Sequence, residues 1–149
     1  EGGGIRTGNG GCITLVLSKN RQMKMFDNSE VMFNKITPNP DNLDFLNVSA
    51  FFVKGSANFE IGPGPCSLNV DTDILTVKMP ENFAALFKMQ YKKKDKVEFI
   101  RIAVKSGRVQ VLNKKTKSVY DLESLNEMTI DRNSQITGPT RFPASSEVF

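Results

Sequence analysis

The chain has 149 residues, a length that suits one domain with a sizeable hydrophobic core. Hydrophobic residues make up 39% of it and charged residues 24%, which excludes a disordered or a collagen-like chain. The net charge of +4 leaves anionic partners open, whereas the complete lack of histidine excludes Ser-His-Asp and Cys-His catalysis and histidine-ligated metals.

The apolar runs and the cysteines indicate which kind of protein and which compartment to expect. The longest apolar runs, such as ITLVL and FAALF, are far shorter than the ~20 residues of a membrane-spanning helix, so we expect a soluble protein. Cys12 and Cys66 follow no zinc spacing, and we expect reduced, buried thiols, which favour an intracellular protein. Eleven phenylalanines and no tryptophan favour a dry core or a dry protein interface.

The first third of the chain predicts two strands after a glycine-rich start. The opening EGGGIRTGNGG is expected to be a flexible segment, residues 1–11, outside the fold. Cys12–Leu17 is rich in β-forming residues and predicts a strand, and Val31–Ile36 predicts another after the turn DNS. TPNPDN closes that hairpin, because its prolines remove backbone donors.

The segment Val48–Ile61 predicts one long strand with a bend at Gly55. Counting by two from Ile61 places Phe59, Ala57, Val53 and Phe51 on the core face. The same count places Ala50 and Phe52 on the opposite face, where an exposed phenylalanine needs a partner.

Short strands continue from residue 67 to residue 104. SLNV and ILTVKM predict two strands separated by the turn DTD, and Pro80 ends the second. Ala85–Tyr91 and Val97–Val104 both alternate, with Ile100, Ile102 and Val104 facing inward. Many short strands with turn residues between them indicate an all-β sandwich or barrel.

The last third predicts less regular structure. Val109–Leu112 and Ser118–Tyr120 predict a small hairpin around NKKTK. Asp121 is expected to cap a single helical turn in which Leu122, Leu125 and Met128 share a face. The barrel domain with this extension is therefore expected over residues 12–136, followed by a loose tail over residues 137–149.

Charged side chains offer two candidate sites. Asp71 and Asp73 form a pair that is more typical of a solvated turn than of a glycosidase. Two lysine clusters are typical of solvated hairpin tips, with weak nucleic-acid binding as the alternative; they are Lys92, Lys93 and Lys94, and Lys114, Lys115 and Lys117.

The order of strands and turns from Val48 to Val104 resembles the cupin core, which implies an all-β, cupin-like jelly-roll barrel. DILTVKMPENFAALF looks like the second cupin motif, with Ala85 where that motif has its metal-binding histidine. The strand VSAFFVKGSANFEI and the turn MPENFAALFKMQ also resemble the metal-free cupin dimerisation domains of the centromere protein C family, in the inner kinetochore.

This resemblance implies a non-enzymatic homodimerisation module with no cofactor and no metal, in the nucleus at the centromere. It would join two copies of a kinetochore scaffold and bind a centromeric histone loading factor or another kinetochore protein, without a membrane or a small-molecule substrate. The implied dimer interface is Ala50, Phe52, Phe87 and Met89, and the implied partner-binding residues are Phe83 and Phe142. The alternatives are a β-barrel that binds a small ligand or a glycan, and a basic nucleic-acid-binding module.

Overall fold

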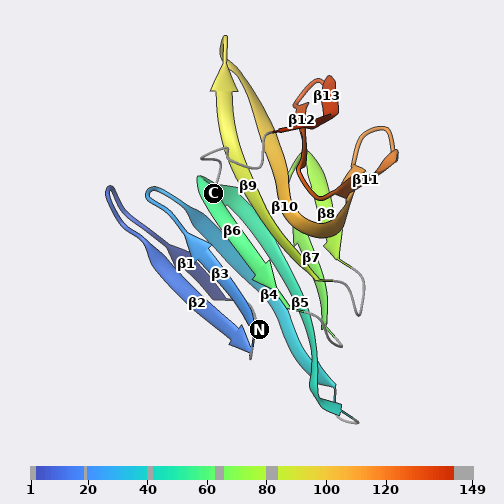
Figure 1. The fold of residues 1–149 in the computed structure, drawn as a ribbon. Helices are drawn as coiled ribbons and strands as arrows, with labels where there is room; N and C mark the ends of the chain where they lie inside the picture. The colour runs from blue at the N-terminus through green and yellow to red at the C-terminus, as the bar shows by residue number, and fades with distance from the viewer. Residues whose placement is uncertain (1–2, 19, 40–41, 63–65, 80–83, 143–149) are drawn as a thin grey trace.

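The computed structural model describes residues 3–18, 20–39, 42–62, 66–79 and 84–142, and these form an all-β domain, as predicted (Figure 1). In the described part of the chain, no helix is long and apolar enough to cross a membrane. The strands are β1 (Gly3–Arg6), β2 (Ile13–Ser18), β3 (Arg21–Met25), β4 (Glu30–Asn39), β5 (Asn42–Lys54), β6 (Ser56–Ile61), β7 (Cys66–Asp71), β8 (Leu75–Met79), β9 (Ala85–Lys94), β10 (Val97–Asn113), β11 (Val119–Glu123), β12 (Asn126–Asp131) and β13 (Ile136–Arg141).

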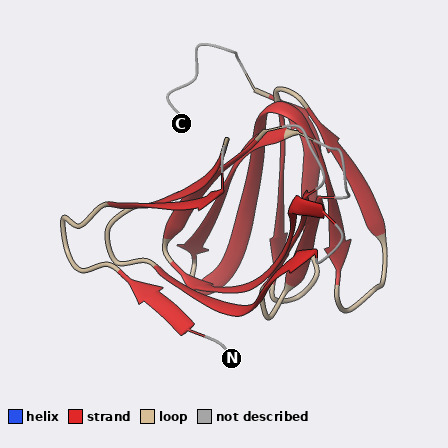
Figure 2. Ribbon diagram, turned by 90° about the horizontal axis from the view of Figure 1, so that it is seen from below, coloured by secondary structure: helices blue, strands red, loops and turns tan. Residues whose placement is uncertain are grey.

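The strands form one strongly curled sheet of 13 strands, seen as an open half-barrel in Figure 2. Its main path runs β1-β4-β5-β7-β8-β10-β9-β6-β3-β2. The long strand β10 joins the two halves, because its first part pairs with β9 and β12 and its last part with β8 and β11. Neighbouring strands are antiparallel except for β5 and β7, which are parallel.

The core lies inside the curl and follows the two-residue period of the strands. On β9, Phe87 and Met89 are fully buried, and on β10 Ile100, Ile102 and Val104 are fully buried, as the alternation predicts. The stacked rings of Phe59 and Phe87, 4.9 Å apart, join β6 to β9. The inner face of the described strands therefore forms the hydrophobic core.

The buried and exposed faces of the segment 48–61 differ from the prediction because the backbone bends at Gly55. The expected bend is present, with a positive φ of 91° at Gly55, but it ends one strand and starts another. Because this bend shifts the alternation by one residue, Ala50 and Phe52 face the core before it, and Ala57 and Phe59 face the core after it. Counting through the glycine therefore placed Phe52 on the wrong face.

A second bend lies in β10. Gly107 has a positive φ of 82°, next to a register shift between Val104 and Ser106. A Cβ at this position would lie 1.9 Å from the carbonyl oxygen of Ala84, so only glycine fits. The close approach lets β10 leave one half of the sheet and enter the other.

Both ends of the chain and the last third also differ from the sequence predictions. Residues 3–6, which we expected outside the fold, pair with β4 as β1. No helical turn follows Asp121; this residue lies in β11, and Met128 and Ile130 alternate with Thr129 in β12. β13 extends from Ile136 to Arg141 and pairs with β12.

Cys12 is free and exposed, which contradicts the expected buried thiol. It lies just before β2, an edge strand that the core covers only in part. The side chain of Cys66 lies outside the described residues.

Candidate functional site

The four residues implied as a dimer interface all lie in the core. Ala50 is 1% exposed, and Phe52, Phe87 and Met89 are 0% exposed. Phe52 stacks on Tyr91 from β9, with ring centroids 5.4 Å apart. These side chains therefore hold the two halves of the curled sheet together and present no surface to a partner.

The implied partner-binding residues do not form an exposed site in the described structure. Phe142 is 6% exposed, and its backbone N–H donates to the carbonyl of Leu125. Phe83 lies outside the described residues.

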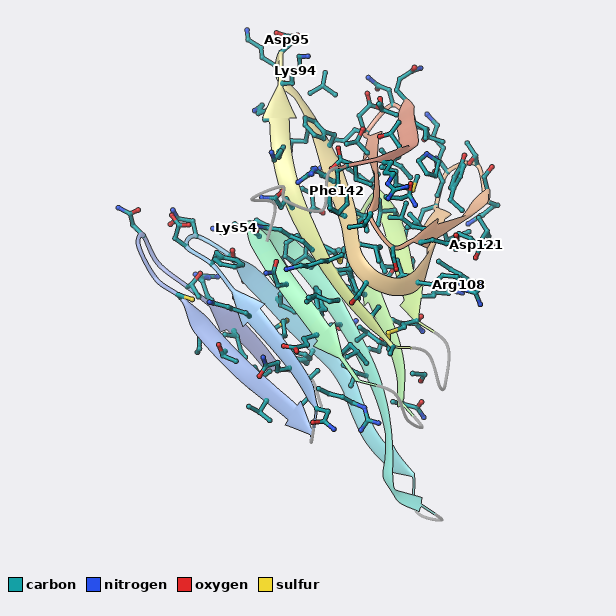
Figure 3. The ribbon with its side chains drawn as sticks, viewed as in Figure 1. Lys54, Lys94, Asp95, Arg108, Asp121 and Phe142 are labelled. Carbon is teal, nitrogen blue, oxygen red and sulfur yellow. The ribbon has the colours of Figure 1, made fainter. Side chains whose placement is uncertain are left out.

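The lysine clusters lie on hairpin tips, as predicted. Lys92, Lys93 and Lys94 end β9 beside the turn at Asp95, and Figure 3 shows Lys94 and Asp95 at the tip of this hairpin. The other cluster lies in the turn between β10 and β11, where Lys114 pairs with Asp71 at 2.8 Å. Nucleic-acid binding by these lysines stays a prediction.

A pocket of about 410 Å³ lies on the outer face of the sheet, between the β9–β10 hairpin and the β12–β13 hairpin. β10 supplies apolar surface through Val97 and Phe99, and the surrounding side chains are polar. The lining residues are Lys94, Asp95, Val97, Phe99, Thr129, Asp131, Gln135 and Thr137.

Strand register brings these residues together. In the first part of β10 the even-numbered residues Ile100, Ile102 and Val104 face inward, so Val97 and Phe99 point outward. Phe99 lies opposite Asp131, and Thr129, two residues before Asp131, lies opposite Thr137, so neighbouring rows of side chains from β10, β12 and β13 meet at the pocket. The pocket is therefore built on paired strands, which hold side chains more rigidly than loops do.

Asp131 shapes the turn at one end of this pocket. Its Oδ1 accepts hydrogen bonds from the backbone N–H groups of Asn133, at 2.8 Å, and Gln135, at 2.9 Å. Its own N–H donates to the carbonyl of Gln135. These bonds fix the backbone of the β12–β13 turn, including that of Gln135, whose side chain lines the pocket.

A smaller pocket of about 150 Å³ lies on the other side of the same turn, and Asp131 lines both pockets. Next to Asp131, Arg132 donates to Asp73 at 2.5 Å and to Glu98 at 3.4 Å. Tyr91 also donates its hydroxyl hydrogen to Asp73, at 2.8 Å. This cluster ties the β12–β13 turn to the turn before β8.

The cluster shifts the pKa values of its members in opposite directions. Burial alone would raise the pKa of the Asp73 carboxyl, but hydrogen bonds from Arg132 and Tyr91 lower it below its ordinary value. Burial and the hydrogen bond to Asp73 raise the pKa of the Tyr91 hydroxyl, which therefore stays a donor. Asp73 is thus a charged acceptor in the folded protein.

We expect the Asp73 contribution to stability to disappear in acid. Because folding lowers the Asp73 pKa, this contribution is present above the ordinary value of 3.8 and is lost as the pH falls through the folded value. Its size is under about 1 kcal/mol, since the Arg132–Asp73 pair is nearly half exposed and water screens it.

Urea unfolding at pH 7 and near pH 3 measures this contribution. The Asp73→Asn variant is expected to show a smaller loss of unfolding free energy between the two pH values than the wild type does. Asp121→Asn, which changes an exposed acid on β11, is the control. Equal acid sensitivity in the wild type and Asp73→Asn would contradict the expectation.

Sequence reasoning missed the pocket, although one signal was present. The outward positions Val97 and Phe99 are apolar on a face where β9 carries lysines and glutamine. Two apolar side chains on a polar face are typical of a binding surface. Thr129, Gln135 and Thr137 carried no such signal, because only the pairing of β12 with β10 and β13 brings them to Phe99.

Comparison with known proteins finds no matching family model and no matching curated protein. Two crystal structures of a "putative anti-sigma factor" from Parabacteroides distasonis ATCC 8503 have the same fold. One has a TM-score of 0.69 and 16% identity, over 92% of this chain and 59% of the other. The second has a TM-score of 0.65 and 19% identity, over 91% of this chain and 58% of the other.

These neighbours establish the β-rich fold, and the chain spans under two thirds of their length. They contradict the implied kinetochore function, because both are described as anti-sigma factors from a bacterium. The centromere localisation, the homodimeric scaffold and the histone-loading partner are wrong for the same reason. The β-rich fold is compatible with a cupin-like barrel, but nothing links it to the centromere protein C family.

Proposed function

We propose that this chain is a non-enzymatic, ligand-binding β domain of a larger regulatory protein. The observation that carries the proposal is the outer pocket of about 410 Å³, which is within the size range of small-molecule sites. The fold neighbours support the regulatory setting, since both are described as anti-sigma factors. In this setting, the domain detects a ligand, and the rest of the protein passes the signal on.

The side chains around the pocket suit a small, hydroxyl-rich ligand such as a saccharide. Phe99 and Val97 offer apolar surface for one face of a sugar ring. Thr129, Thr137 and Gln135 offer hydroxyl and amide groups for its edge. One lysine and two aspartates give the lining a formal charge of −1, which disfavours an anion.

The groups that the pocket supplies support the proposed non-enzymatic role. Its acids are Asp95 and Asp131, and one oxygen of Asp131 already accepts hydrogen bonds from two backbone N–H groups of the turn. No hydrogen bond pairs one of these acids with a threonine hydroxyl of the described lining, as a nucleophile and its base would be paired.

The Phe99→Ala variant tests this function. Removing the ring takes away the largest apolar contact, so we expect the affinity for the ligand to fall about tenfold or more. A panel of neutral mono- and oligosaccharides, followed by NMR chemical shifts of the 149-residue chain, identifies the ligand and its contact residues.

Val119→Ala is the matched control, because Val119 is 59% exposed and lies on β11, outside the pocket. Its affinity is expected to equal that of the wild type. Shifts centred away from the pocket, or equal affinity in Phe99→Ala, would refute the proposal, as would a panel in which no saccharide binds at millimolar concentration.

A further inference from the structure

The curled sheet has open edges, which differ in how well they are protected against pairing with a further strand. Among the described strands, β1, β2, β11 and β13 each pair on one side only. Proteins protect such edges with short strands, charges, prolines or bulges, because an unpaired row of N–H and C=O groups accepts another strand.

Three of these edges carry such protection. β1 has only 4 residues, with two glycines. β11 carries the exposed acids Asp121 and Glu123, and Figure 3 shows Asp121 on this strand. β13 contains Pro139, which lacks a backbone donor, and ends at the exposed Arg141.

Of these features, β2 has only a register shift, between Val16 and Ser18. Its 6 residues, ITLVLS, contain no charge, proline or glycine, and the strand forms the outer edge of its half of the sheet (Figure 1). Val16 is 67% exposed and Ile13 is 41% exposed. Leu15 and Leu17 pack against the core but stay half-buried. Both faces of this edge therefore have apolar surface that one more strand would cover.

We propose that β2 is a docking site for an extended segment of a partner protein, which joins the sheet as an additional strand. The backbone pattern of a strand edge is complementary to another strand and to no compact ligand. Alternate apolar side chains of the segment cover Ile13, Leu15 and Leu17 on one face and lie beside Val16 on the other.

The positive charge near β2 indicates that the partner segment carries an acidic residue. Lys24 on β3 is exposed and lies directly beside Thr14 of β2. The whole chain also carries a net charge of +4. A segment with an acidic residue near the Thr14 end fits this surface, because the long Lys24 side chain lies only one strand beyond β2 and the chain as a whole is positive.

This docking site is distinct from the ligand pocket. The pocket lies over β10, β12 and β13, whereas β2 is separated from β10 by β3, β6 and β9. One curved sheet thus carries a small-molecule site on one part and a protein-docking edge on another. Either site can fail its test without affecting the other.

A random twelve-residue peptide library displayed on phage, selected on the 149-residue chain, tests the docking site. We expect enriched peptides with alternating apolar residues and an acidic residue near one end. NMR of the chain with one such synthetic peptide is expected to show at least tenfold slower hydrogen exchange for those β2 amides that point away from β3.

Val16→Glu and Val119→Glu form the matched pair of variants. Both change an exposed valine on an edge strand, so both are expected to keep the wild-type NMR spectrum elsewhere. Val16→Glu is expected to weaken peptide binding at least tenfold, because it places a charge on the docking edge, and Val119→Glu is expected to leave it unchanged.

Three results would overturn the proposal. They are a selection that enriches no peptide, enriched peptides that bind Val16→Glu as well as the wild type, and unchanged exchange of the β2 amides in the complex. Sedimentation that shows β2-dependent self-association of the chain would also overturn it, since a second copy would then occupy the edge.

Discussion

Replacing Phe52 with alanine is expected to lower the free energy of unfolding by about 3–5 kcal/mol. The ring is 0% exposed and stacks on Tyr91 at 5.4 Å, so its removal leaves a cavity between β5 and β9. Because domains of this kind have about 5–15 kcal/mol of total stability, the variant loses a large share of it. Urea unfolding followed by circular dichroism measures the change.

Met32→Ala is the control for this substitution. Met32 lies on the neighbouring strand β4, opposite Phe51, and is 47% exposed, so its truncation is expected to cost under about 0.5 kcal/mol. If Phe52 belonged to an interface between subunits, Phe52→Ala would fold with nearly wild-type stability. That outcome would show that the described core is wrong.

Replacing Gly107 with alanine is expected to destabilise the protein by about 2–4 kcal/mol. The residue has a φ of 82°, which strains any residue with a Cβ. The added Cβ would also lie 1.9 Å from the backbone oxygen of Ala84 and 2.7 Å from the Cα of Ala85. Since these are backbone atoms, β9 and β10 must separate to make room.

Gly8→Ala provides the comparison, because a Cβ there meets no atom within 4 Å. We expect its unfolding free energy to change by under about 1 kcal/mol, in the stabilising direction, because alanine restricts the unfolded chain. Thermal unfolding of both variants measures the difference in their stability. A Gly107→Ala protein as stable as Gly8→Ala would mean that β10 does not bend as described.

Local patterns predicted the strands of the barrel well. In β9 and β10, the alternation of large apolar residues with lysine, glutamine and arginine predicted both the strands and the buried face. Turn residues predicted the β10–β11 hairpin around NKKTK. These predictions succeeded because a half-buried strand needs only its own two-residue period to be recognised.

Patterns failed where a backbone bend or a distant strand decides the outcome. At Gly55 the shift of one residue moved Phe52 from the predicted surface to the core. The spacing of Leu122, Leu125 and Met128 suited a helical turn, but pairing with β10 made strands of this segment. Pairing with β4 likewise gave residues 3–6 a partner that their glycines did not predict.

The functional prediction failed for a related reason. Its motifs were strands that end at glycine or proline, and any curled β-sheet needs such turns to change direction. The kinetochore function depended on the likeness to one cupin family and on an exposed Phe52; the bacterial fold neighbours contradict this function, and Phe52 lies in the core. The ligand-binding alternative came from the same sequence, but its residues became visible only in the fold.

By itself, the sequence determined the β class, most strand positions and the lack of imidazole chemistry, because composition and local alternation are enough for each of these. Only the tertiary structure decided which face of the strand before Gly55 is buried, that Phe99, Asp131 and Gln135 surround one pocket, and that β2 forms an edge. These features depend on pairing between strands far apart in the chain and on bends at two glycines, and no local pattern of residues contains that information.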